Sequence, residues 1–404
     1  MKLFEKAHHY LINTYVKYPI QLTQGKGSFV WDNNGKKYLD FYGGHAVCLL
    51  GHNPKETLNA LCQQAKKLIF YSNIFNTAPA ILLAEQVALT LKPKKYQVYF
   101  TNSGSEANET ALKIARKHTG KKHIISFKNS FHGRGITALG VTGINSYHQC
   151  VPNIDDFTSF AELGDMNSVK SAWKPDTAAV ICEPIQSIGG MNMAKPEFYK
   201  ALAQFCKEKN ILLIFDEVQT GLGRTGTFWF ARNVGVFPHI ITSAKGIACG
   251  LPLAAVIVKK RISAKIKIGD HATTFGGGPA VCAAGLATIK TILQPGFLAN
   301  VKNKEAYIRK KLTAHPLIAC VKGQGLLLGI EFTKPMPHFV ELCLENGFIL
   351  GTSYNKKVFR IMPPLTVSKN EIDLFVKLFF QVLTQGTSEK RGFVTKFANF
   401  VRKF

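Results

Sequence analysis

The sequence is poor in acidic residues and has no long apolar run. Its 404 residues include 25 Asp and Glu against 51 Lys and Arg, a formal net charge of +26. No apolar stretch approaches the roughly 20 residues that a transmembrane helix requires. His8 and His9 stand where a signal peptide needs an unbroken apolar segment. These absences argue against a membrane span and a secretion signal, and they predict a cytoplasmic protein.

Closely spaced cysteines are also missing. The nine cysteines are at least 14 positions apart, so there is no CxxC motif for a metal or a redox-active dithiol. Most lie in apolar surroundings such as VICEP and IACG. Because free cysteine is among the most buried residue types, we expect reduced thiols in the core and no metal site.

The excess of positive charge predicts a surface that attracts anions: phosphorylated ligands, carboxylates, an acidic partner or nucleic acid. The basic residues are dispersed, however, and no nucleic-acid-binding motif lies beside the local concentrations at 259–267 and in the tail. The tail, KRGFVTKFANFVRKF at 390–404, carries four phenylalanines at helical spacing and five basic residues. Packing of this stripe on the domain is favoured over contact with a membrane or an acidic carrier protein.

Helix and strand patterns alternate from about residue 55, which predicts an α/β domain with a largely parallel sheet. The strand-like runs are QVYFT, HIISF, AAVICEP, ILLIFDEV and LAAVIV. The run EANETALKIARKHTG predicts a helix that ends at Gly120. Before this domain, DNNG between FVW and YLDF predicts a hairpin. With a break at LQPGF, we expect an N-terminal arm and part of a small domain (1–52), a large domain (53–294) and a C-terminal small domain (295–404).

The segment ILLIFDEVQTGLGRTG, residues 211–226, contains a literal GxGxxG. A dinucleotide site needs an acid about 20 residues further on, and no Asp or Glu occurs from 218 to 269. We therefore interpret the glycines as a flexible surface turn. Asp216, at the end of the apolar strand, must be paired with a cation or protonated if it is buried. Alone, it is equally well explained as a capping residue.

Two other positions complete a pattern with Asp216. Lys245 stands between small residues and apolar strands, where a desolvated amine becomes nucleophilic toward aldehydes. Ser103 and Glu106 fit a capping box, and the amides of such a helix start bind anions. Separately, these residues fit a surface lysine and an ordinary capped helix. Together, the acid, the amine and the anion site match pyridoxal 5′-phosphate.

From about Gly25 to Ile372 the sequence resembles the class III pyridoxal-phosphate-dependent aminotransferases. The motifs occur in the order of that family: WDNNGKKYLDF, NSGSEANE, FHGR, EPIQ, FDEVQTGLGRTG, SAKG, TTFGG and FRIMPPL. One such motif is weak evidence, but eight in order are specific. The resemblance implies fold type I, with a mostly parallel seven-stranded sheet in the large domain and a smaller α+β domain. It also implies a homodimer with active sites at the subunit interface.

The resemblance assigns roles residue by residue. Lys245 would bind the cofactor and move a proton, and Asp216 would keep the ring nitrogen protonated. The other implied cofactor-binding residues are Ser103, Gly104, Ser105, Phe131, Glu217, Val218, Gln219 and, from the neighbouring subunit, Thr274. The implied substrate-binding residues are Arg134, Glu183, Thr273 and Arg360. Arg360 would grip an α-carboxylate by a two-point contact, and Arg134 would receive the distal end of the substrate.

Within the family, the motifs are most similar to those of enzymes that pass the δ-amino group of N2-acetylornithine to 2-oxoglutarate, a step of arginine biosynthesis. Ornithine, 4-aminobutyrate and carrier-protein-bound lysine or ornithine aminotransferases share the cofactor residues and stay open as alternatives. A basic nucleic-acid-binding protein on a degenerate scaffold is disfavoured, because every cofactor position is intact.

Three residues depart from the family pattern. Ile188 replaces a common glutamate that pairs with the carboxylate-binding arginine, Gly278 replaces an asparagine and His45 replaces an aliphatic residue. None of the three touches the cofactor chemistry, so the reaction class is better determined than the substrate.

Overall fold

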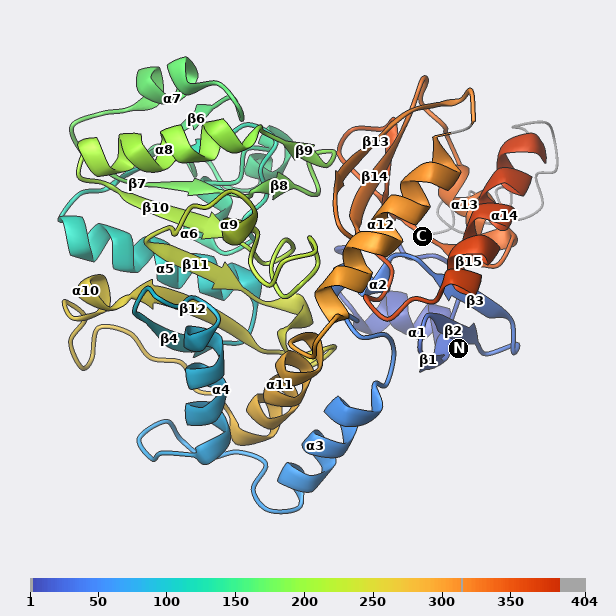
Figure 1. The fold of residues 1–404 in the computed structure, drawn as a ribbon, viewed down its shortest axis with the longest axis horizontal. Coiled ribbons are helices and arrows are strands. Elements are labelled where there is room, and N and C mark those ends of the chain that lie inside the picture. The colour runs from blue at the N-terminus through green and yellow to red at the C-terminus, as the bar shows by residue number, and fades with distance from the viewer. Residues whose placement is uncertain (1–2, 314, 386–404) are drawn as a thin grey trace.

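The computed structural model describes residues 3–313 and 315–385. Its largest element is a seven-stranded sheet with the order β4-β12-β11-β10-β7-β5-β6. The strands are β4 (Tyr96–Thr101), β5 (His123–Phe127), β6 (Thr158–Ala161), β7 (Thr177–Cys182), β10 (Leu212–Asp216), β11 (Ile240–Ser243) and β12 (Ala254–Lys259). Neighbouring strands are parallel except in the two pairs that include β12. The expected mostly parallel sheet is confirmed (Figure 1).

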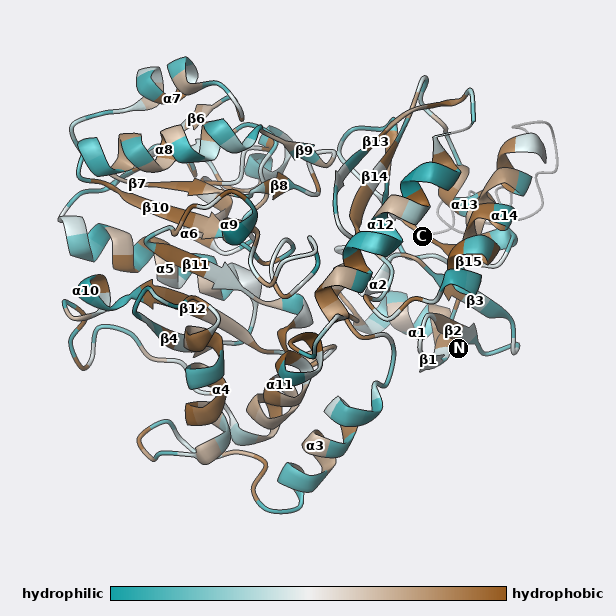
Figure 2. Cartoon of the chain, viewed as in Figure 1, coloured by the Kyte–Doolittle hydropathy of each residue, from teal (hydrophilic) through white to brown (hydrophobic). Residues whose placement is uncertain are grey.

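The strands at the centre of this sheet are apolar on both faces because helices cover both faces. Every residue of β7, β10 and β11 is buried. Helix α5 (Gly104–Thr119) packs on one face, and α8 (Pro196–Glu208) packs on the other. Figure 2 shows apolar residues concentrated on the strands and hydrophilic residues on the outer side of α8. Such double coverage explains why continuous apolar runs, rather than alternating ones, mark these strands.

The helices of the large sheet include α5, whose end was predicted from the sequence. Helix α5 ends at Gly120, whose φ of 70° is left-handed, as the sequence predicted. The others are α3 (Lys55–Ala65), α4 (Ala78–Leu89), α6 (Ile136–Gly140), α7 (Met166–Ala172), α9 (Phe230–Asn233), α10 (Lys260–Ser263) and α11 (Pro279–Ile292). A bend of 69° separates α11 from α12 (Phe297–Leu312), at the predicted break.

The rest of the chain forms a second body, on the right in Figure 1. One sheet has the order β13-β14-β17-β16, and another joins the N-terminal strands to β15 in the order β1-β2-β3-β15. The predicted hairpin is confirmed, because β2 and β3 pair antiparallel. The strands are β1 (Leu22–Lys26), β2 (Phe29–Asp32), β3 (Lys37–Asp40), β13 (Ile318–Gln324), β14 (Leu327–Phe332), β15 (Phe348–Ile349), β16 (Gly351–Thr352) and β17 (Val358–Ile361). The domain limits themselves stay a prediction.

The second body also contains the short helices α1 (Leu3–Tyr10), α2 (Gly43–Ala46) and α13 (Phe339–Glu345) and the 17-residue helix α14 (Lys369–Gln385). A two-stranded ribbon pairs β8 (Ile185–Gln186) with β9 (Asn192–Met193). Within the described ranges no single helix is both long and apolar enough to cross a membrane, and only the bent pair α11 and α12 passes by length and composition. The phenylalanine-rich tail at 390–404 lies outside the described residues.

The prediction of a flexible surface turn at GLGRTG is wrong. Residues 221–226 are buried, and the side chain of Arg224 is 1% exposed. Its guanidinium donates to the carbonyls of Leu326 and Pro363, in the second body. A Cβ added to Gly325 would lie 2.4 Å from the Arg224 carbonyl oxygen, so the two backbones touch. The turn is covered by a segment about 100 residues away, which no local pattern shows.

The expectation of core thiols holds for only part of the set. Five cysteines are buried: Cys182, Cys206, Cys249, Cys282 and Cys343. Cys62, Cys150 and Cys320 are exposed, and Cys48 is partly exposed. All nine are free thiols, so exposed and buried sulfur coexist in the same chain.

Candidate active site

Three adjacent parallel strands deliver three charged residues to one edge of the large sheet. Glu183 follows β7, Asp216 ends β10, and Lys245 comes two residues after β11. The register pairs Asp216 with Thr242, three positions before Lys245. Ligands in open α/β sheets bind outside the carboxyl ends of the strands. The topology therefore brings together a lysine and two acids that are far apart in the sequence.

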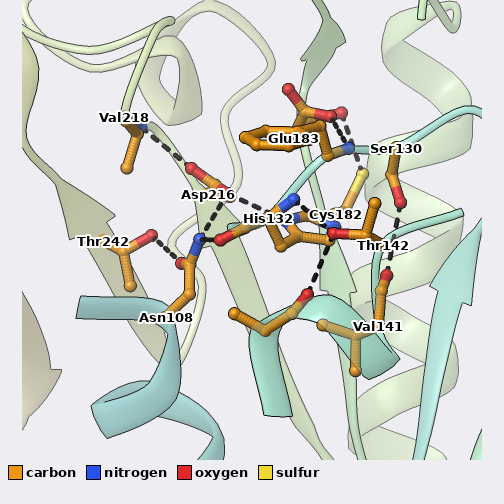
Figure 3. Close-up of polar contacts among 12 residues, drawn as sticks. Asn108, Ser130, His132, Val141, Thr142, Cys182, Glu183, Asp216, Val218 and Thr242 are labelled. Carbon is orange, nitrogen blue, oxygen red and sulfur yellow. Dashed lines mark hydrogen bonds and ion pairs between the residues drawn. The ribbon is translucent and has the colours of Figure 1, made fainter. Parts of the chain in front are cut away.

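Asp216 is the centre of a buried hydrogen-bond network (Figure 3). Its Oδ2 accepts from Asn108 Nδ2 at 2.7 Å and lies 2.8 Å from His132 Nδ1, while its Oδ1 accepts from the amide of Val218 at 3.1 Å. The Asn108 Oδ1 in turn accepts from Thr242 Oγ1 at 2.7 Å. A buried carboxylate that accepts several hydrogen bonds is stabilised in its charged form. The requirement that Asp216 be paired is thus met by an imidazole, an amide side chain and a backbone amide.

Neither His132 nor Asn108 was singled out from the sequence. His132 is the second residue of FHGR, of which only the flanking Phe131 and Arg134 received roles. Asn108 lies on the buried face of α5, one turn after Gly104. A polar residue on the buried face of an otherwise apolar stripe was the available signal for Asn108, because such a group needs a partner.

Lys245 begins a short 3₁₀ turn with a positive φ of 50°. Backbone strain of this kind in a non-glycine residue is typical of functional sites. Burial lowers the pKa of the Lys245 amine, opposed by the negative charges of Asp216 and Glu183 and reinforced by Arg360. A lowered pKa increases the fraction of neutral amine, the form that acts as a nucleophile or a base.

Glu183 closes the site on the other side of Asp216. It is 5% exposed, and its Oε2 accepts from the amide of Phe131 at 2.7 Å. Burial and the nearby Asp216 charge raise the pKa of Glu183. The Phe131 ring meets Tyr147 edge to face, with centroids 5.8 Å apart. Glu183 thus positions the loop that carries both Phe131 and His132.

The start of α5 has the geometry of an anion site. Ser103 caps the helix, and its Oγ accepts from the Glu106 amide at 3.2 Å. The Glu106 carboxylate accepts from the amide of Asn102 at 2.9 Å, which completes the predicted box one residue early. The first turn leaves amides without intrahelical acceptors, at the positive end of a 16-residue helix. A Cβ added to Gly104 would lie 2.9 Å from Val218 Cγ1, so only glycine lets α5 approach the Asp216 strand this closely.

The predicted carboxylate-binding residue Arg360 is 3% exposed and has only neutral partners. It donates to the Thr352 carbonyl at 2.6 Å and to Ser187 Oγ at 3.1 Å, and it lies 3.5 Å from Tyr42 Oη. Ser187 Oγ donates in turn to Gln219 Oε1 at 3.0 Å. No described residue forms an ion pair with Arg360. Burial lowers its pKa, with Tyr42 and Glu183 opposing.

A cavity of about 1060 Å³ opens beside Arg360. Its walls come from the N-terminal segment, from the second body and from two loops of the large domain. Among its lining residues are Tyr42, His45, Tyr147, Ile188 and Arg360. His45 lies 2.5 Å from Tyr42 Oη, and burial lowers the pKa of its imidazole to about 4. Two of the three departures from the family pattern, Ile188 and His45, thus face the same cavity as Arg360.

Four predicted site residues do not join the group formed by Asp216, Lys245 and Glu183 within one subunit. Arg134 is exposed, with its guanidinium 3.7 Å from the centre of the Tyr147 ring. Thr273 donates to Glu106 Oε1 at 2.9 Å, beside the start of α5 rather than Arg360, and Thr274 is exposed. The Glu217 carboxylate points to α9, where it accepts from the amides of Phe230 and Ala231. Of these, Thr273 contacts the start of α5 through Glu106.

Comparison with known proteins agrees with this arrangement. A family model described as aminotransferase class-III matches residues 10–383. The chain belongs to the class III aminotransferases. Among similar aminotransferases, the acetylornithine aminotransferase of Methanosarcina mazei is 40% identical over 382 residues, which cover 94% of this chain and 95% of that protein. The acetylornithine aminotransferase of Oceanobacillus iheyensis is 38% identical, over 93% of this chain and 96% of that protein.

Solved aminotransferase structures share the fold. The ornithine aminotransferase of Toxoplasma gondii aligns with a TM-score of 0.87 at 29% identity, covering 95% of this chain and 94% of that one. The N-acetylornithine aminotransferase of Stenotrophomonas maltophilia aligns with a TM-score of 0.82 at 28% identity, covering 95% and 99%. Seven strands in the large sheet and the α/β architecture are consistent with fold type I.

The site suits pyridoxal phosphate, the cofactor of this aminotransferase family. Two features of the site match the two ends of that molecule. The α5 amides suit its phosphate, and Asp216 suits a protonated ring nitrogen. The close approach at Gly104 brings both features to one place. His132 Nε2 is buried and has no partner among the described residues, while its Nδ1 faces Asp216. The donor set of this aminotransferase therefore fits the cofactor.

Proposed function

We propose that this aminotransferase moves the δ-amino group of N2-acetyl-L-ornithine to 2-oxoglutarate with the help of pyridoxal 5′-phosphate. The products are N-acetylglutamate 5-semialdehyde and L-glutamate, as in arginine biosynthesis. The observation that carries the proposal is the placement of Lys245 and Asp216 at the ends of adjacent strands, next to the start of α5. Relatives named acetylornithine aminotransferase, at 36–40% identity over nearly the whole chain, support the choice of amino donor.

Besides Lys245, the residues that would hold the cofactor come from three segments. Ser103, Gly104 and Ser105 would bind the phosphate, Phe131 would cover one ring face, Gln219 would contact the phenolic oxygen and Asp216 the ring nitrogen. When bound, the cofactor supplies an aldehyde for the amino group and a ring that withdraws electrons from the substrate carbon. Val218 donates its amide to Asp216 and so fixes the carboxylate orientation.

Lys245 would bind the cofactor and transfer the proton in each half-reaction. Burial lowers the pKa of its amine, which increases the fraction of the neutral form that can accept a proton. His132 and Asn108 both contact Oδ2 of Asp216 and so hold the carboxylate in place. The site would therefore separate two tasks: Asp216 would contact the ring nitrogen, and Lys245 would transfer the proton.

Arg360 would bind the α-carboxylate of glutamate and 2-oxoglutarate. Its neutral partners Thr352, Ser187 and Tyr42 hold the guanidinium without cancelling its charge. Two-point contact with a carboxylate is the strongest interaction a buried guanidinium makes. Ile188 leaves the cavity without the masking carboxylate seen at this position in the family pattern, so Arg360 is available in both half-reactions.

We also propose a homodimer in which the loop with Thr274 completes the phosphate site of the neighbouring subunit. Residues 69–75 expose Ile69, Phe70, Tyr71, Ile74 and Phe75. This apolar segment is continuous with the Thr274 loop: Phe70 packs on Phe275 with centroids 5.2 Å apart, and Asn73 donates to the Thr273 carbonyl at 3.2 Å. Contiguous exposed aromatics of this kind support burial by a second copy. Sedimentation of the purified protein as a monomer would argue against it.

A spectral titration tests the function. The purified protein should show visible absorption from bound cofactor, which N2-acetylornithine bleaches and 2-oxoglutarate restores. Ornithine, 4-aminobutyrate and a carrier-bound substrate serve as comparison amino donors. A higher kcat/KM for unacetylated ornithine would overturn the choice of substrate, whereas the absence of any visible absorption would overturn the reaction class.

A further inference from the structure

A second group of reactive residues lies outside the proposed cofactor site, in the segment between β3 and α3. The His52 Nε2 is 2.8 Å from Asp40 Oδ2, and the His52 Nδ1 is 3.5 Å from Cys48 Sγ. The carboxylate, the imidazole and the thiol thus form a chain of two hydrogen bonds. The same order of groups activates cysteine nucleophiles in enzymes.

The protein holds this acid and this imidazole rigidly. Asp40 is 4% exposed, and its other oxygen accepts from the amides of Tyr42 and Gly43, both at 2.9 Å. The backbone of His52 exchanges two hydrogen bonds with Gly27, at 2.8 and 3.0 Å. The imidazole is therefore fixed on both sides, and only its Nδ1 is left to face Cys48. Cys48 itself is partly exposed to solvent.

The neighbouring His52 distinguishes the surroundings of Cys48 from those of the buried thiols Cys249 and Cys282. The hydrogen bond to Asp40, with a further contribution from Cys48, raises the pKa of His52 to about 10, so the imidazole carries a proton at neutral pH. The His52 Nδ1 lies 3.5 Å from the Cys48 sulfur, so its positive charge can stabilise negative charge that develops on the sulfur during nucleophilic attack. By contrast, burial raises the pKa of the Cys249 thiol to about 11 and that of Cys282 to about 12. Those two thiols are kept neutral and covered.

We propose that Cys48 is a modification site that undergoes thiol–disulfide exchange with low-molecular-weight disulfides. The Cys48 thiolate attacks one sulfur of the disulfide, the S–S bond of the reagent breaks, and the second sulfur leaves as a thiolate that takes a proton from water. One disulfide is consumed and one mixed disulfide forms, so no external oxidant is needed. Asp40 and His52 are positioning residues, because they act through the sulfur of Cys48.

The position of Cys48 links this chemistry to the proposed active site. The next residue, Leu49, packs on the residue after Lys245: a Cβ added to Gly246 would lie 2.8 Å from Leu49 Cδ2. On the other side, the turn held by Asp40 carries Tyr42, which contacts Arg360. A bulky adduct on Cys48 therefore displaces segments next to both Lys245 and Arg360. We expect modification to lower the amino-transfer rate and reduction to restore it.

The test exposes the holoenzyme to oxidised glutathione and follows each cysteine by peptide mass spectrometry. Solvent-exposed Cys62 and Cys150 serve as internal references for ordinary thiols. Cys48 should react about tenfold faster than these, because the His52 imidazolium beside its sulfur stabilises the negative charge of the attacking group. Cys48 modified no faster than Cys62, or modified only after denaturation, would overturn the proposal. This readout does not depend on the proposed function.

Variants separate positioning from accessibility. His52→Gln should lower the rate at Cys48 to that of Cys62, while the rate at Cys62 itself reports that the variant is folded. His338→Gln, at an exposed histidine, is the matched control and should change neither rate. Asp40→Asn should give an intermediate rate. An unchanged Cys48 rate in His52→Gln would show that exposure alone determines its reactivity and would refute the assigned triad.

Discussion

The two ends of the candidate active site are built in different ways. Around Asp216, charged groups come from neighbouring strand ends, and Asp216 itself is held by short hydrogen bonds with Asn108 and His132. Around Arg360, a single charge is surrounded by neutral groups from three segments more than 140 residues apart: Tyr42, Ser187 and Thr352. The end around Asp216 suits one molecule that stays bound, the proposed cofactor. The second end has to accept two different substrates in turn, so its charge is left uncompensated.

The largest effect should come from the amine at the first end. Lys245→Ala is expected to lower kcat by about a thousandfold or more, because the group that moves the proton is removed. Bound cofactor should persist in the variant, held by its phosphate. Lys259→Ala is the matched control: its amine is also partly buried and has a pKa lowered by burial to about 8, but it donates to the Phe237 carbonyl. Steady-state kinetics with unchanged turnover in Lys245→Ala would contradict the assignment.

The second largest effect should come from removing the carboxylate that would contact the ring nitrogen. Asp216→Asn is expected to lower kcat more than tenfold, since the ring loses the group that keeps its nitrogen protonated. His132→Asn should cost less, because Asn108 and the Val218 amide still hold the carboxylate. Stopped-flow absorbance of the first half-reaction checks the order. A larger loss in His132→Asn than in Asp216→Asn would mean that the imidazole, rather than the acid, is the essential group.

The second end is probed by Arg360→Lys. This substitution keeps the charge but loses the planar two-point contact, so kcat/KM for 2-oxoglutarate should fall about ten- to a hundredfold. The effect should lie mainly in KM, because the arginine binds the substrate without taking part in proton transfer. Arg232→Lys, which keeps donors for backbone carbonyls near residue 90, controls for general effects of the change. A fall in kcat with unchanged KM would place Arg360 in the chemistry instead.

A smaller effect is expected from a substitution that gives Arg360 a charged partner and so makes the two ends more alike. Ile188→Glu supplies a carboxylate in the cavity that Arg360 lines. A new ion pair there competes with the substrate carboxylate, so KM for 2-oxoglutarate should rise a few-fold. Ile188→Gln is the uncharged control and should have less effect. Equal KM values for both variants would show that steric change, not charge, is responsible.

The smallest effect concerns stability and lies outside both ends. Hydrogen bonding to Asp40 raises the pKa of His52 from 6.5 to about 10. The folded state therefore binds this proton more tightly than the unfolded state. The resulting stabilisation is complete below about pH 6.5 and is lost as the pH rises toward 10. Urea unfolding of wild type and His52→Gln should show a difference in the free energy of unfolding that shrinks over this range. A difference that is constant with pH would exclude the proposed charge on His52.

The first end was largely predictable from the sequence, and the second was not. Asp216 ends an apolar strand and Ser103 begins a capped helix, and both features depend on short windows of sequence. Arg224 shows the limit: its glycine-rich turn has the local signs of an exposed loop, but the second body buries it. The same holds for the neutral partners of Arg360, which are brought together only by packing of distant segments. His132 was missed because one imidazole in a motif gives no sign of which acid it will face.

Helix α5 fixes the distance between the anion site and Asp216. Its first residue, Gly104, belongs to the anion site, and four residues later Asn108 donates a hydrogen bond to Asp216. At 1.5 Å per residue, these two points are about 6 Å apart along the axis, a spacing that a stiff helix cannot adjust. A ligand must have a matching length to contact both the anion site and Asp216. A phosphate ester that is longer or shorter would bind at one of these two points and miss the other.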